Sequence, residues 1–493
     1  MTPSVALFLW LILLLGLLRY DPAKDPETSL ALWVPVIWIF FTATRLPSQW
    51  LGSSVGLAAQ AFEEGNPLDR VIFSLLIVLA IVILMVRSFD WGVFFSNNLT
   101  LMALLLFALV SVVWSDFPVV SFKRWFRDLG NYLVILVVVA DAHPLEAIQT
   151  VFRRISYLLI PLSILLIKYY PQIGMQYSFW TGARMYVGPT TGKNMLGALC
   201  LVSGLFFFWD TTMRWSDRKD RRTRNILLVN IAFIGMTLWL LRLAGSATST
   251  VCLTIGCLII VVAHSKMSKR HPGFLKLLSP VAFCIYLILA FGFEINGNLA
   301  GAVGRDSTLT GRSNIWNAVL STHTNPLIGT GYESFWLGPR LLHVWQLAGQ
   351  VNEAHNGYLE IYLNLGLIGV FFLFLFMIAS YLTICKRLRS PSVGIASLSL
   401  AIWTILLFYN MTESAAFKGQ LMWVIFVLVA IGPGKDLVTV ESASLVPAGN
   451  FPTRRMVPFS PNPLGSGKKA VVGMDRPNPP RLSRTPFEIT KRR

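Results

Sequence analysis

The sequence contains few charged residues for its length. Of its 493 residues, 13% are Asp, Glu, Lys or Arg, whereas soluble domains carry about 25%. Charged side chains cover much of the surface of a soluble protein, so this shortage excludes an ordinary soluble globular protein. The mean hydropathy of +0.61 agrees with that exclusion.

Cysteine is scarce as well, and its spacing excludes the usual cysteine sites. No two of the five cysteines form a CxxC pair, and all lie in or beside apolar runs, where a thiol is a small buried hydrophobe. The polar segments between the apolar runs that we assign below to the outside of a membrane contain no HExxH, DxD or paired-histidine motif. We therefore expect no metal and no cofactor. The cysteines are Cys200, Cys252, Cys257, Cys284 and Cys385.

Acidic residues are few relative to basic ones. The 24 Asp and Glu stand against 42 Lys and Arg, which leaves a net charge of +18. In a soluble chain such a balance would indicate nucleic acid as a partner, but in a membrane protein it reports orientation. Nearly all of the excess lies in three short loops and the C-terminal segment. We therefore expect no nucleic-acid partner.

Long apolar runs recur along most of the chain, and they are continuous rather than alternating. Only helices and closed barrels satisfy the backbone in lipid, so these runs predict an all-α integral membrane protein with about 12–13 transmembrane helices. Met1–Tyr20 lacks a basic start and a small-residue cleavage site, so we interpret it as the first anchor. The runs are Val5–Leu18, Leu30–Thr42, Val71–Val86, Leu99–Trp114, Leu129–Ala140, Ile155–Lys168, Asn194–Trp209, Ile226–Leu241, Thr250–Ala263, Leu277–Phe293, Tyr358–Ile384, Val393–Asn410 and Phe417–Ile431.

Short basic loops predict the orientation of these helices. Lys and Arg accumulate in cytoplasmic loops, and the three basic loops are 210–225, 264–276 and 385–394. The turn Arg242–Thr248, the loop 294–357 and the turn Asn410–Phe417 are then outside. The side of the membrane on which Lys123, Arg124 and Arg127 lie is left open, and with it the number of spans. If Leu129–Ala140 crosses the membrane, these cations are outside and there are about thirteen spans, but if it lies at the interface they are cytoplasmic and there are about twelve.

The chain therefore divides into a polytopic membrane domain, 1–431, with a large periplasmic loop, 294–357, and a C-terminal segment, 432–493. The C-terminal segment has ten prolines, eleven Lys and Arg, four acids and no apolar period. This composition predicts a disordered cytoplasmic tail that is attracted to the anionic inner leaflet.

The loop 294–357 is the most unusual segment of a protein otherwise joined by short turns. Long loops inside a compact protein are usually functional, and this one contains three of the six histidines and several aromatic residues. Aromatic and polar side chains together can stack on and hydrogen-bond sugar rings. The alternative interpretation is that these aromatic residues form a belt at the interface between membrane and water.

Several segments of this loop and its surroundings resemble the O-antigen ligase/polymerase superfamily, and within it the chain is most similar to exopolysaccharide-production polymerases. The similarity is dense over about 310–370 and extends in order through most of 50–430. The segments are TGRSNIW (310–316), NPLIGTG (325–331), EAHNGYL (353–359) and LGLIG (365–369), with GNPLDR (65–70), WSDFP (114–118) and GKNMLG (192–197).

The resemblance implies a glycosyltransferase of the bacterial inner membrane whose active site faces the periplasm. Such enzymes transfer an undecaprenyl-diphosphate-linked oligosaccharide to a glycan acceptor as polymerases, or to a lipid A-core sugar as ligases. They use no nucleotide, because the donor already carries an activated anomeric bond. Other polysaccharide-export proteins are further partners that this resemblance implies.

Two residues match the catalytic positions of that family, namely Arg312 and His355. A guanidinium binds phosphate oxygens bidentately and stays charged, so Arg312 suits the negative charge that grows on a departing diphosphate. A histidine with a pKa near neutrality suits the general base that an unactivated sugar hydroxyl needs. Taken alone, each has an ordinary alternative, since Arg312 would be a surface cation and His355 an interfacial or capping residue.

Further cations outside the membrane are candidates for binding the diphosphate. They are Arg242, which is the nearest counterpart of an arginine common in the family, and Arg184 and Lys193, for which interfacial anchoring is the alternative. Lys123 and Arg124 are weaker candidates, because their side of the membrane is open.

Four other residues near these positions have expected roles. Glu353 can orient His355 or simply place negative charge at a helix N-terminus, and Asn356 is a possible support for the same site. Asn194 is expected to be a helix N-cap. The other histidines of the loop, His323 and His343, are not expected to act.

Three functions remain as alternatives. A polysaccharide polymerase is favoured by the subgroup resemblance, and an O-antigen ligase would use the same arginine and histidine chemistry. A flippase or secondary transporter would need internal repeats, broken helices and charges at mid-membrane depth, whereas the charges here gather at helix ends and in the large loop.

Overall fold

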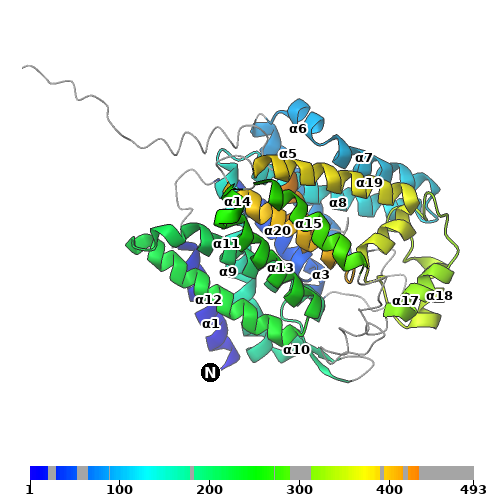
Figure 1. Cartoon of the computed structure of the whole chain (residues 1–493). Coiled ribbons are helices and arrows are strands. Elements are labelled where there is room, and N and C mark those ends of the chain that lie inside the picture. Colours follow the sequence, from blue (N-terminus) through cyan, green and yellow to red (C-terminus); the bar gives the residue numbers. More distant parts are fainter. Residues whose placement is uncertain are drawn as a thin grey trace, which may run out of the picture. The chain divides into compact units, whose positions relative to one another are not determined.

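The computed structural model describes residues 1–19, 29–52, 65–87, 89–177, 182–270, 272–288, 312–388, 393–414 and 420–431 (Figure 1). The chain divides into two units, Met1–Leu445 and Val446–Arg493. All of the described residues belong to the first unit. The predicted tail, 432–493, and the part of the predicted loop before Arg312 lie outside the described residues.

The described residues of the first unit form helices and one pair of short antiparallel strands. In the N-terminal part the elements are α1 (Pro3–Arg19), η1 (Leu30–Leu32), α2 (Trp33–Ala43), α3 (Pro47–Trp50), α5 (Pro67–Val86), α6 (Trp91–Asn97), α7 (Leu99–Val110), η2 (Ser111–Trp114), α8 (Pro118–Val139), α9 (Pro144–Tyr169), α10 (Pro171–Gly174), β1 (Met175–Tyr177) and β2 (Arg184–Tyr186). The strands β1 and β2 pair with Tyr177 opposite Arg184.

The remaining elements are again helices. They are α11 (Lys193–Arg214), η3 (Trp215–Asp217), α12 (Arg221–Ala244), α13 (Ala247–His264), α14 (Lys266–Arg270), α15 (Pro272–Leu287), α17 (Arg312–Ser321), α18 (Gly338–Ala348), α19 (Gly357–Arg387), α20 (Val393–Tyr409) and α21 (Leu421–Ile431). Each of the thirteen predicted apolar runs overlaps one of the helices in these two lists. The prediction of an all-α membrane protein is therefore confirmed.

The number of helices long and apolar enough to span a bilayer is smaller than the 12–13 that the runs predict. Among the described residues six helices meet that criterion, and a seventh span results if α6 and the α7–η2 segment, bent by 88°, are counted as one. The difference arises because five further apolar helices have only 10–17 residues and because α8 carries four charges in its first half. A helix of 20 residues spans about 30 Å, so the shorter ones cross only part of that thickness by themselves.

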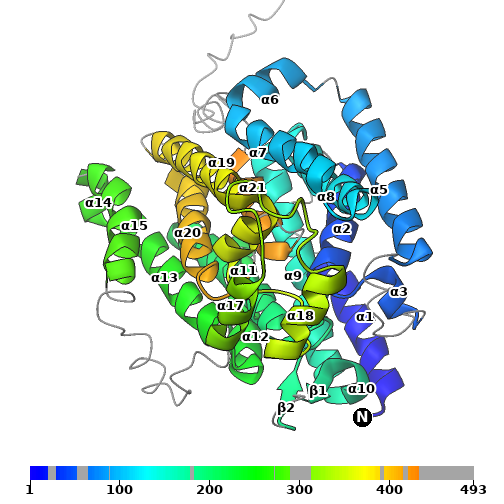
Figure 2. The same ribbon diagram turned by 90° about the vertical axis from the view of Figure 1, so that its right-hand side faces the viewer.

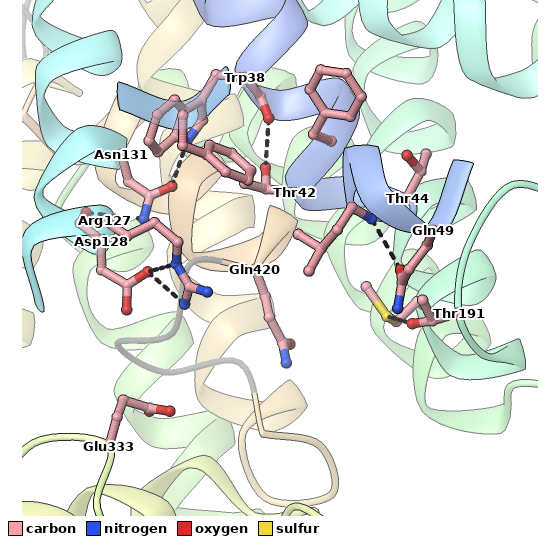
Figure 3. A pocket seen from close by; sticks show the side chains of 14 residues that line it. Trp38, Thr42, Thr44, Gln49, Arg127, Asp128, Asn131, Thr191, Glu333 and Gln420 are labelled. Atoms are coloured by element: carbon pink, nitrogen blue, oxygen red, sulfur yellow. Dashed lines mark hydrogen bonds and ion pairs between the residues drawn. The ribbon is translucent and has the colours of Figure 1, made fainter. Parts of the chain in front are cut away.

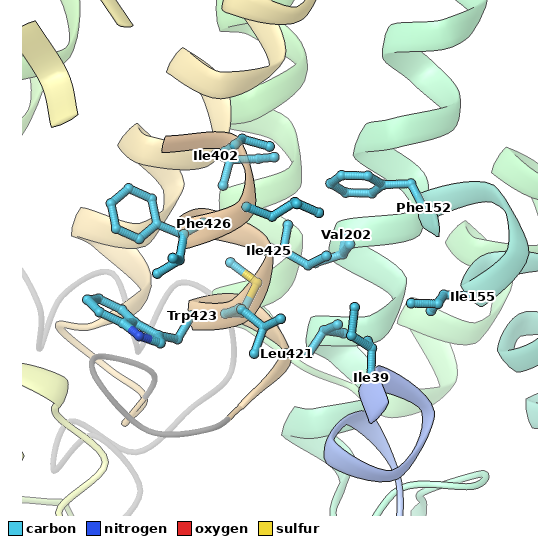
Figure 4. Packing of buried hydrophobic residues seen from close by; sticks show 14 of the residues in the cluster. Ile39, Phe152, Ile155, Val202, Ile402, Leu421, Trp423, Ile425 and Phe426 are labelled. Carbon is cyan, nitrogen blue, oxygen red and sulfur yellow. The ribbon is translucent and has the colours of Figure 1, made fainter. Parts of the chain in front are cut away.

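Helix α21 forms the centre of the bundle. All eleven of its residues are buried, and Trp423 and Phe426 pack among side chains of neighbouring helices (Figure 4). A helix that is apolar on every face is stable only when it is surrounded, and α21 contacts α2, α8, α11, α19 and α20. The indole Nε1 of Trp423 donates to the hydroxyl of Tyr132 on α8, 2.9 Å away.

The two ends of the bundle differ in charge. At one end Trp209 donates to the carbonyl of Gly394, and Arg387 donates to that of Ile431, which brings the basic loops 210–225 and 385–394 to the same end. At the other end, Thr248 and Thr412 are hydrogen-bonded at 2.8 Å. The turns Arg242–Thr248 and Asn410–Phe417 therefore lie together, as the charge pattern predicts.

Helix α8 runs between these two ends. Arg124 in its first half donates to the carbonyl of Glu333 in the large loop. Beyond its C-terminus, Asp141 pairs at 2.7 Å with Arg87 at the end of the span α5. This arrangement favours the alternative in which Leu129–Ala140 crosses the membrane and the cations of α8 lie on the side of the large loop.

Helices α17 and α18 pack together beside the start of α19 (Figure 2). Their apolar faces form a second hydrophobic cluster, separate from that of the bundle, which includes Ile315, Phe335 and Val344. The described part of the large loop is thus an ordered structure with its own core.

Candidate functional site

The turn that carries His355 is held by hydrogen bonds on both sides of that residue. The carbonyl of Ala354 accepts from the indole of Trp316 at 2.9 Å, and its amide donates to the carboxylate of Glu360. Asn356 caps α19, because its side chain accepts from two amides of the first turn. His355 is left with a φ of 50°, a conformation that costs about 1–3 kcal/mol for a residue other than glycine. The turn therefore fixes the direction of the imidazole.

A loop–helix contact positions this turn relative to the bundle. Helix α19 is interrupted at Gly366, where φ is 64°, and the amides of Leu367 and Ile368 donate to carbonyls of the segment 325–331 instead of continuing the helix. At Gly329 and Gly366 a Cβ atom would lie within 2.5 Å of backbone atoms of the facing segment. Only glycine permits this approach, which explains why the segments NPLIGTG and LGLIG have glycine at these positions.

The carboxylate of Glu413 joins the predicted catalytic residues. Its Oε1 lies 2.7 Å from Nη2 of Arg312 and accepts from Nδ2 of Asn194 at 2.9 Å, and its Oε2 lies 3.5 Å from Nδ1 of His355. The same Nδ1 is 3.0 Å from Oε1 of Glu353. Glu413 and Arg312 are 7% and 10% exposed, whereas His355 and Glu353 are 28% and 30% exposed. We call these five residues the Glu413 cluster: a buried acid–arginine pair lies next to a histidine that is partly exposed to solvent.

The electrostatics of the cluster favour the charged form of the imidazole. Burial alone would lower the pKa of His355, but the carboxylates of Glu353 and Glu413 outweigh it and raise the pKa to about 10. The sequence-based expectation of a pKa near neutrality is therefore wrong, since it could not include the second acid. At pH 7 the imidazolium form of His355 therefore predominates.

Glu413 was not among the residues that the sequence singled out. It follows a buried helix end in the turn after α20, and only its position as an acid next to apolar spans could have indicated a role. Asn194 was assigned the wrong role, because the N-cap of α11 is Gly192 and the side chain of Asn194 reaches Glu413 instead. Both residues become informative only when the ends of α11 and α20 are seen to meet.

The other predicted cations lie at the same end but outside the acid–arginine pair. Lys193 is the first residue of α11, next to Asn194. Arg242 is exposed in the last turn of α12, and Arg184 is exposed on β2, which packs against α11 and α12. Lys193 is therefore next to a residue of the Glu413 cluster, and Arg184 and Arg242 lie on elements that contact α11 or one another, outside the cluster itself.

The ligand atoms of Glu353, His355 and Glu413 all lie within 4.8 Å of one another, which is close enough to share a metal ion. Imidazole and carboxylate are suitable donors for several divalent metals. The fit is poor, however, because Oε1 of Glu413 already accepts from Arg312 and Asn194, and a guanidinium at that distance repels a cation. The residues suit binding of an anion beside Arg312 better than binding of a metal.

The remaining histidines of the loop, His323 and His343, are exposed on the surface of the α17–α18 unit and lie outside the Glu413 cluster. This position agrees with the expectation that they do not act. Arg340, another cation of this unit, pairs with Asp116.

Two comparisons with known proteins bear on this site. Residues 231–374 match the profile of the family described as O-antigen ligase, and this range includes Arg242, Arg312, Glu353 and His355. The chain is also 22% identical over 311 residues to the exopolysaccharide production protein ExoQ of Rhizobium meliloti (strain 1021), which covers 60% of this chain and 67% of that protein. The resemblance that the sequence motifs indicated is therefore confirmed: the chain is a multi-pass membrane protein that is similar over residues 231–374 to the O-antigen ligase family.

Proposed function

From the premise of an O-antigen ligase/polymerase-type membrane protein, we propose that this chain is a glycosyltransferase of exopolysaccharide or O-antigen polymerisation. It transfers an oligosaccharide from undecaprenyl diphosphate to the hydroxyl of another glycan. The site lies at the periplasmic face of the inner membrane. The observation that carries the proposal is the Glu413 cluster, in which Arg312 and His355 share one buried carboxylate.

The reaction breaks the bond between the anomeric carbon and the diphosphate and forms a bond from that carbon to the acceptor oxygen. The diphosphate leaves with the electron pair of the broken bond, and the acceptor hydroxyl loses a proton. Arg312 is assigned to the departing diphosphate, since its remaining guanidinium N–H groups can bind phosphate oxygens while Glu413 holds it in place. The charge of Arg184, Lys193 and Arg242 around the cluster would hold the lipid diphosphate at the membrane surface.

His355 is assigned to the proton of the acceptor. Its Nδ1 faces Glu353 and Glu413, which leaves Nε2 for the acceptor hydroxyl, an arrangement comparable to the acid–histidine pairs of other transferases and hydrolases. The two carboxylates make the imidazole a strong base but keep it mostly protonated at neutral pH. The active form is then the small neutral fraction. Asn356 supports this arrangement by capping α19 directly after His355.

A ligase that transfers glycan to lipid A-core is the second candidate, since the matched family is described as O-antigen ligase. The similarity to an exopolysaccharide production protein favours the polymerase. Deletion of the chain followed by analysis of lipid-linked glycans distinguishes the two. Single lipid-linked repeat units accumulate if a polymerase is lost, whereas long lipid-linked polymer with unsubstituted core accumulates if a ligase is lost. A normal glycan profile in the deletion strain would contradict both.

The side of the membrane is tested with topology reporters. A periplasm-active reporter enzyme fused after Asn296 is expected to be active, and one fused after Arg222, in a basic loop, is expected to be inactive. Activity of only the second fusion would reverse the orientation and overturn a periplasmic site.

A further inference from the structure

A pocket of about 290 Å³ lies between α2, α8 and the first turn of α11, and its residues have no part in the chemistry described above. Trp38, Phe41 and Phe73 form part of its apolar wall. Its polar lining comes from separate elements, with Arg127 and Asp128 on one side, Gln49 and Thr191 on the other and Gln420 between them (Figure 3). Pockets for drug-sized ligands measure about 300–1,000 Å³, so this one suits a single small unit.

Hydrogen bonds hold the side chains of Arg127 and Asp128 and the backbone of Glu333 in place. Asp128 accepts at Oδ1 from Nε and Nη2 of Arg127, at 3.2 and 3.1 Å, and at Oδ2 from the hydroxyl of Tyr332 at 2.9 Å. Arg127 is nevertheless 46% exposed. Glu333 has a φ of 52°, and its carbonyl accepts from Arg124. The backbone on both sides of the pocket is thus held in place, as a specific binding site requires.

The charge of the lining indicates the kind of ligand. Among the lining residues one arginine stands against two carboxylates, Asp128 and Glu333, and the arginine is already paired. The lining itself therefore has no unpaired cation of the kind that would bind a diphosphate. A neutral sugar ring fits, because its hydroxyl groups donate to carboxylates and accept from guanidinium and amide N–H groups, while its C–H face packs on aromatic rings.

The pocket lies close to the Glu413 cluster. Thr191 and Met195, at the start of α11, line the pocket, while Asn194 of the same turn donates to Glu413. The first turn of α11 therefore contributes to both, through the neighbouring residues Asn194 and Met195. A transferase must hold its acceptor beside the donor, and the first sugar of the donor is bonded directly to a diphosphate, for which this lining offers no unpaired cation.

We propose that this pocket binds a neutral sugar residue of the acceptor glycan. The proposal rests on the glycosyltransferase function proposed above and adds the position of the acceptor to it. Gln420 and Thr191 would then hydrogen-bond the sugar hydroxyls within the pocket.

The test compares Glu333→Gln with Glu146→Gln in the purified full-length chain. Both substitutions remove one carboxylate charge with little change of size, and Glu146 is an exposed residue in the first turn of α9. With a lipid-diphosphate oligosaccharide as donor, Glu333→Gln is expected to raise the KM for the acceptor about tenfold or more and to leave the KM for the donor unchanged. Glu146→Gln is expected to change neither. A raised KM for the donor alone would place a donor sugar in the pocket and overturn the proposal, and unchanged constants for Glu333→Gln would do the same.

A binding measurement keeps this test separate from the proposed function. The probe is a mixture of neutral oligosaccharides released from the polysaccharide of the same cells, without lipid or diphosphate, and binding is measured by calorimetry. Wild type and Glu146→Gln are expected to bind it, and Glu333→Gln is expected to bind about tenfold more weakly. Gln420→Leu, which removes an amide at the pocket without adding charge, should weaken binding as well. If the probe does not bind wild type, or binds every variant equally, the pocket is not an acceptor site. This conclusion does not depend on whether the chain is a transferase, because the measurement involves no transfer reaction.

Discussion

Arg312 and Glu413 are 101 residues apart in the sequence and 2.7 Å apart in the structure. The pair joins the start of α17, in the large loop, to the turn that follows α20. Because both side chains are largely buried, each neutralises a charge that would otherwise be costly at this depth. The pair therefore holds the large loop against the membrane helices at the place where His355 enters the site.

Replacing Arg312 tests whether the guanidinium geometry matters. In Arg312→Lys the positive charge remains, but the compact ammonium lacks the planar guanidinium fork that can pair with Glu413 on one edge and bind a phosphate bidentately on another. We expect transfer to fall by about 10²–10³, as for the loss of one transition-state donor, measured as polymer formed per amount of membrane protein. Arg340→Lys is the matched control, since Arg340 pairs with Asp116, whose side chain is 59% exposed, and such pairs contribute little. Wild-type activity in Arg312→Lys would show that Arg312 only holds the large loop in place through Glu413 and does not act on the diphosphate.

The role of His355 is tested against a second histidine of the same loop. His355→Ala is expected to lower polymer formation by about 10²–10⁴, the usual contribution of a general base, while the amount of protein in the membrane stays unchanged. His343→Ala, at an exposed position on α18, should leave polymer formation intact. A normal distribution of polymer lengths in His355→Ala would exclude the catalytic assignment.

The helices were predictable because apolar runs are local. Each of the thirteen runs corresponds to a helix, and the basic loops correctly group at one end, since both signals are carried by neighbouring residues. Helix boundaries were less accurate, as α8 shows. It begins at Pro118, eleven residues before the apolar run, because its charged first half packs against the large loop rather than lipid.

The site was predictable only in part, because its contacts are not local. Arg312, Glu353 and His355 were found through short motifs. Glu413 and Asn194 join them only because the end of α20 and the start of α11 approach the starts of α17 and α19. The expectation of a near-neutral pKa for His355 was wrong for the same reason. One of the two acids that raise this pKa, Glu413, comes from the turn after α20. The sugar pocket draws on α2, α8, α11 and the large loop, and no spacing in the sequence indicates that combination.

Metal removal tests the alternative use of the Glu413 cluster. Since Arg312 and Asn194 already occupy one carboxylate oxygen of Glu413, we expect the rate of transfer by the purified chain to be unchanged after treatment with EDTA. Addition of Mg²⁺, Mn²⁺ or Zn²⁺ should not raise its melting temperature. If EDTA abolishes transfer and one of these ions restores it, then Glu353, His355 and Glu413 act as metal ligands.

The contact between the large loop and α19 depends on Gly366. In Gly366→Ala the new Cβ would lie 2.3 Å from backbone atoms of Leu327, at a φ of 64°, so the segment 325–331 has to move away. We expect a lower melting temperature in detergent and loss of transfer, because this contact fixes the start of α19 and with it the turn of His355. Gly235→Ala is the control, since a Cβ there has no neighbour within 4 Å. Equal melting temperatures for the two variants would show that the contact is not needed.

The pH dependence of transfer tests the protonation state of His355. The neighbouring carboxylates raise its pKa to about 10, so the neutral, proton-accepting form increases about tenfold with each pH unit up to that value. If His355 is the base, the rate should rise from pH 6 to about 9 and level off near 10. Glu353→Gln removes one acid that raises the pKa, so its rate should level off at a lower pH, whereas the profile of Glu146→Gln should match that of wild type. A rate that is constant up to pH 9 and falls near 10 would identify the imidazolium as the active form, and His355 would then bind the diphosphate as a cation instead of deprotonating the acceptor.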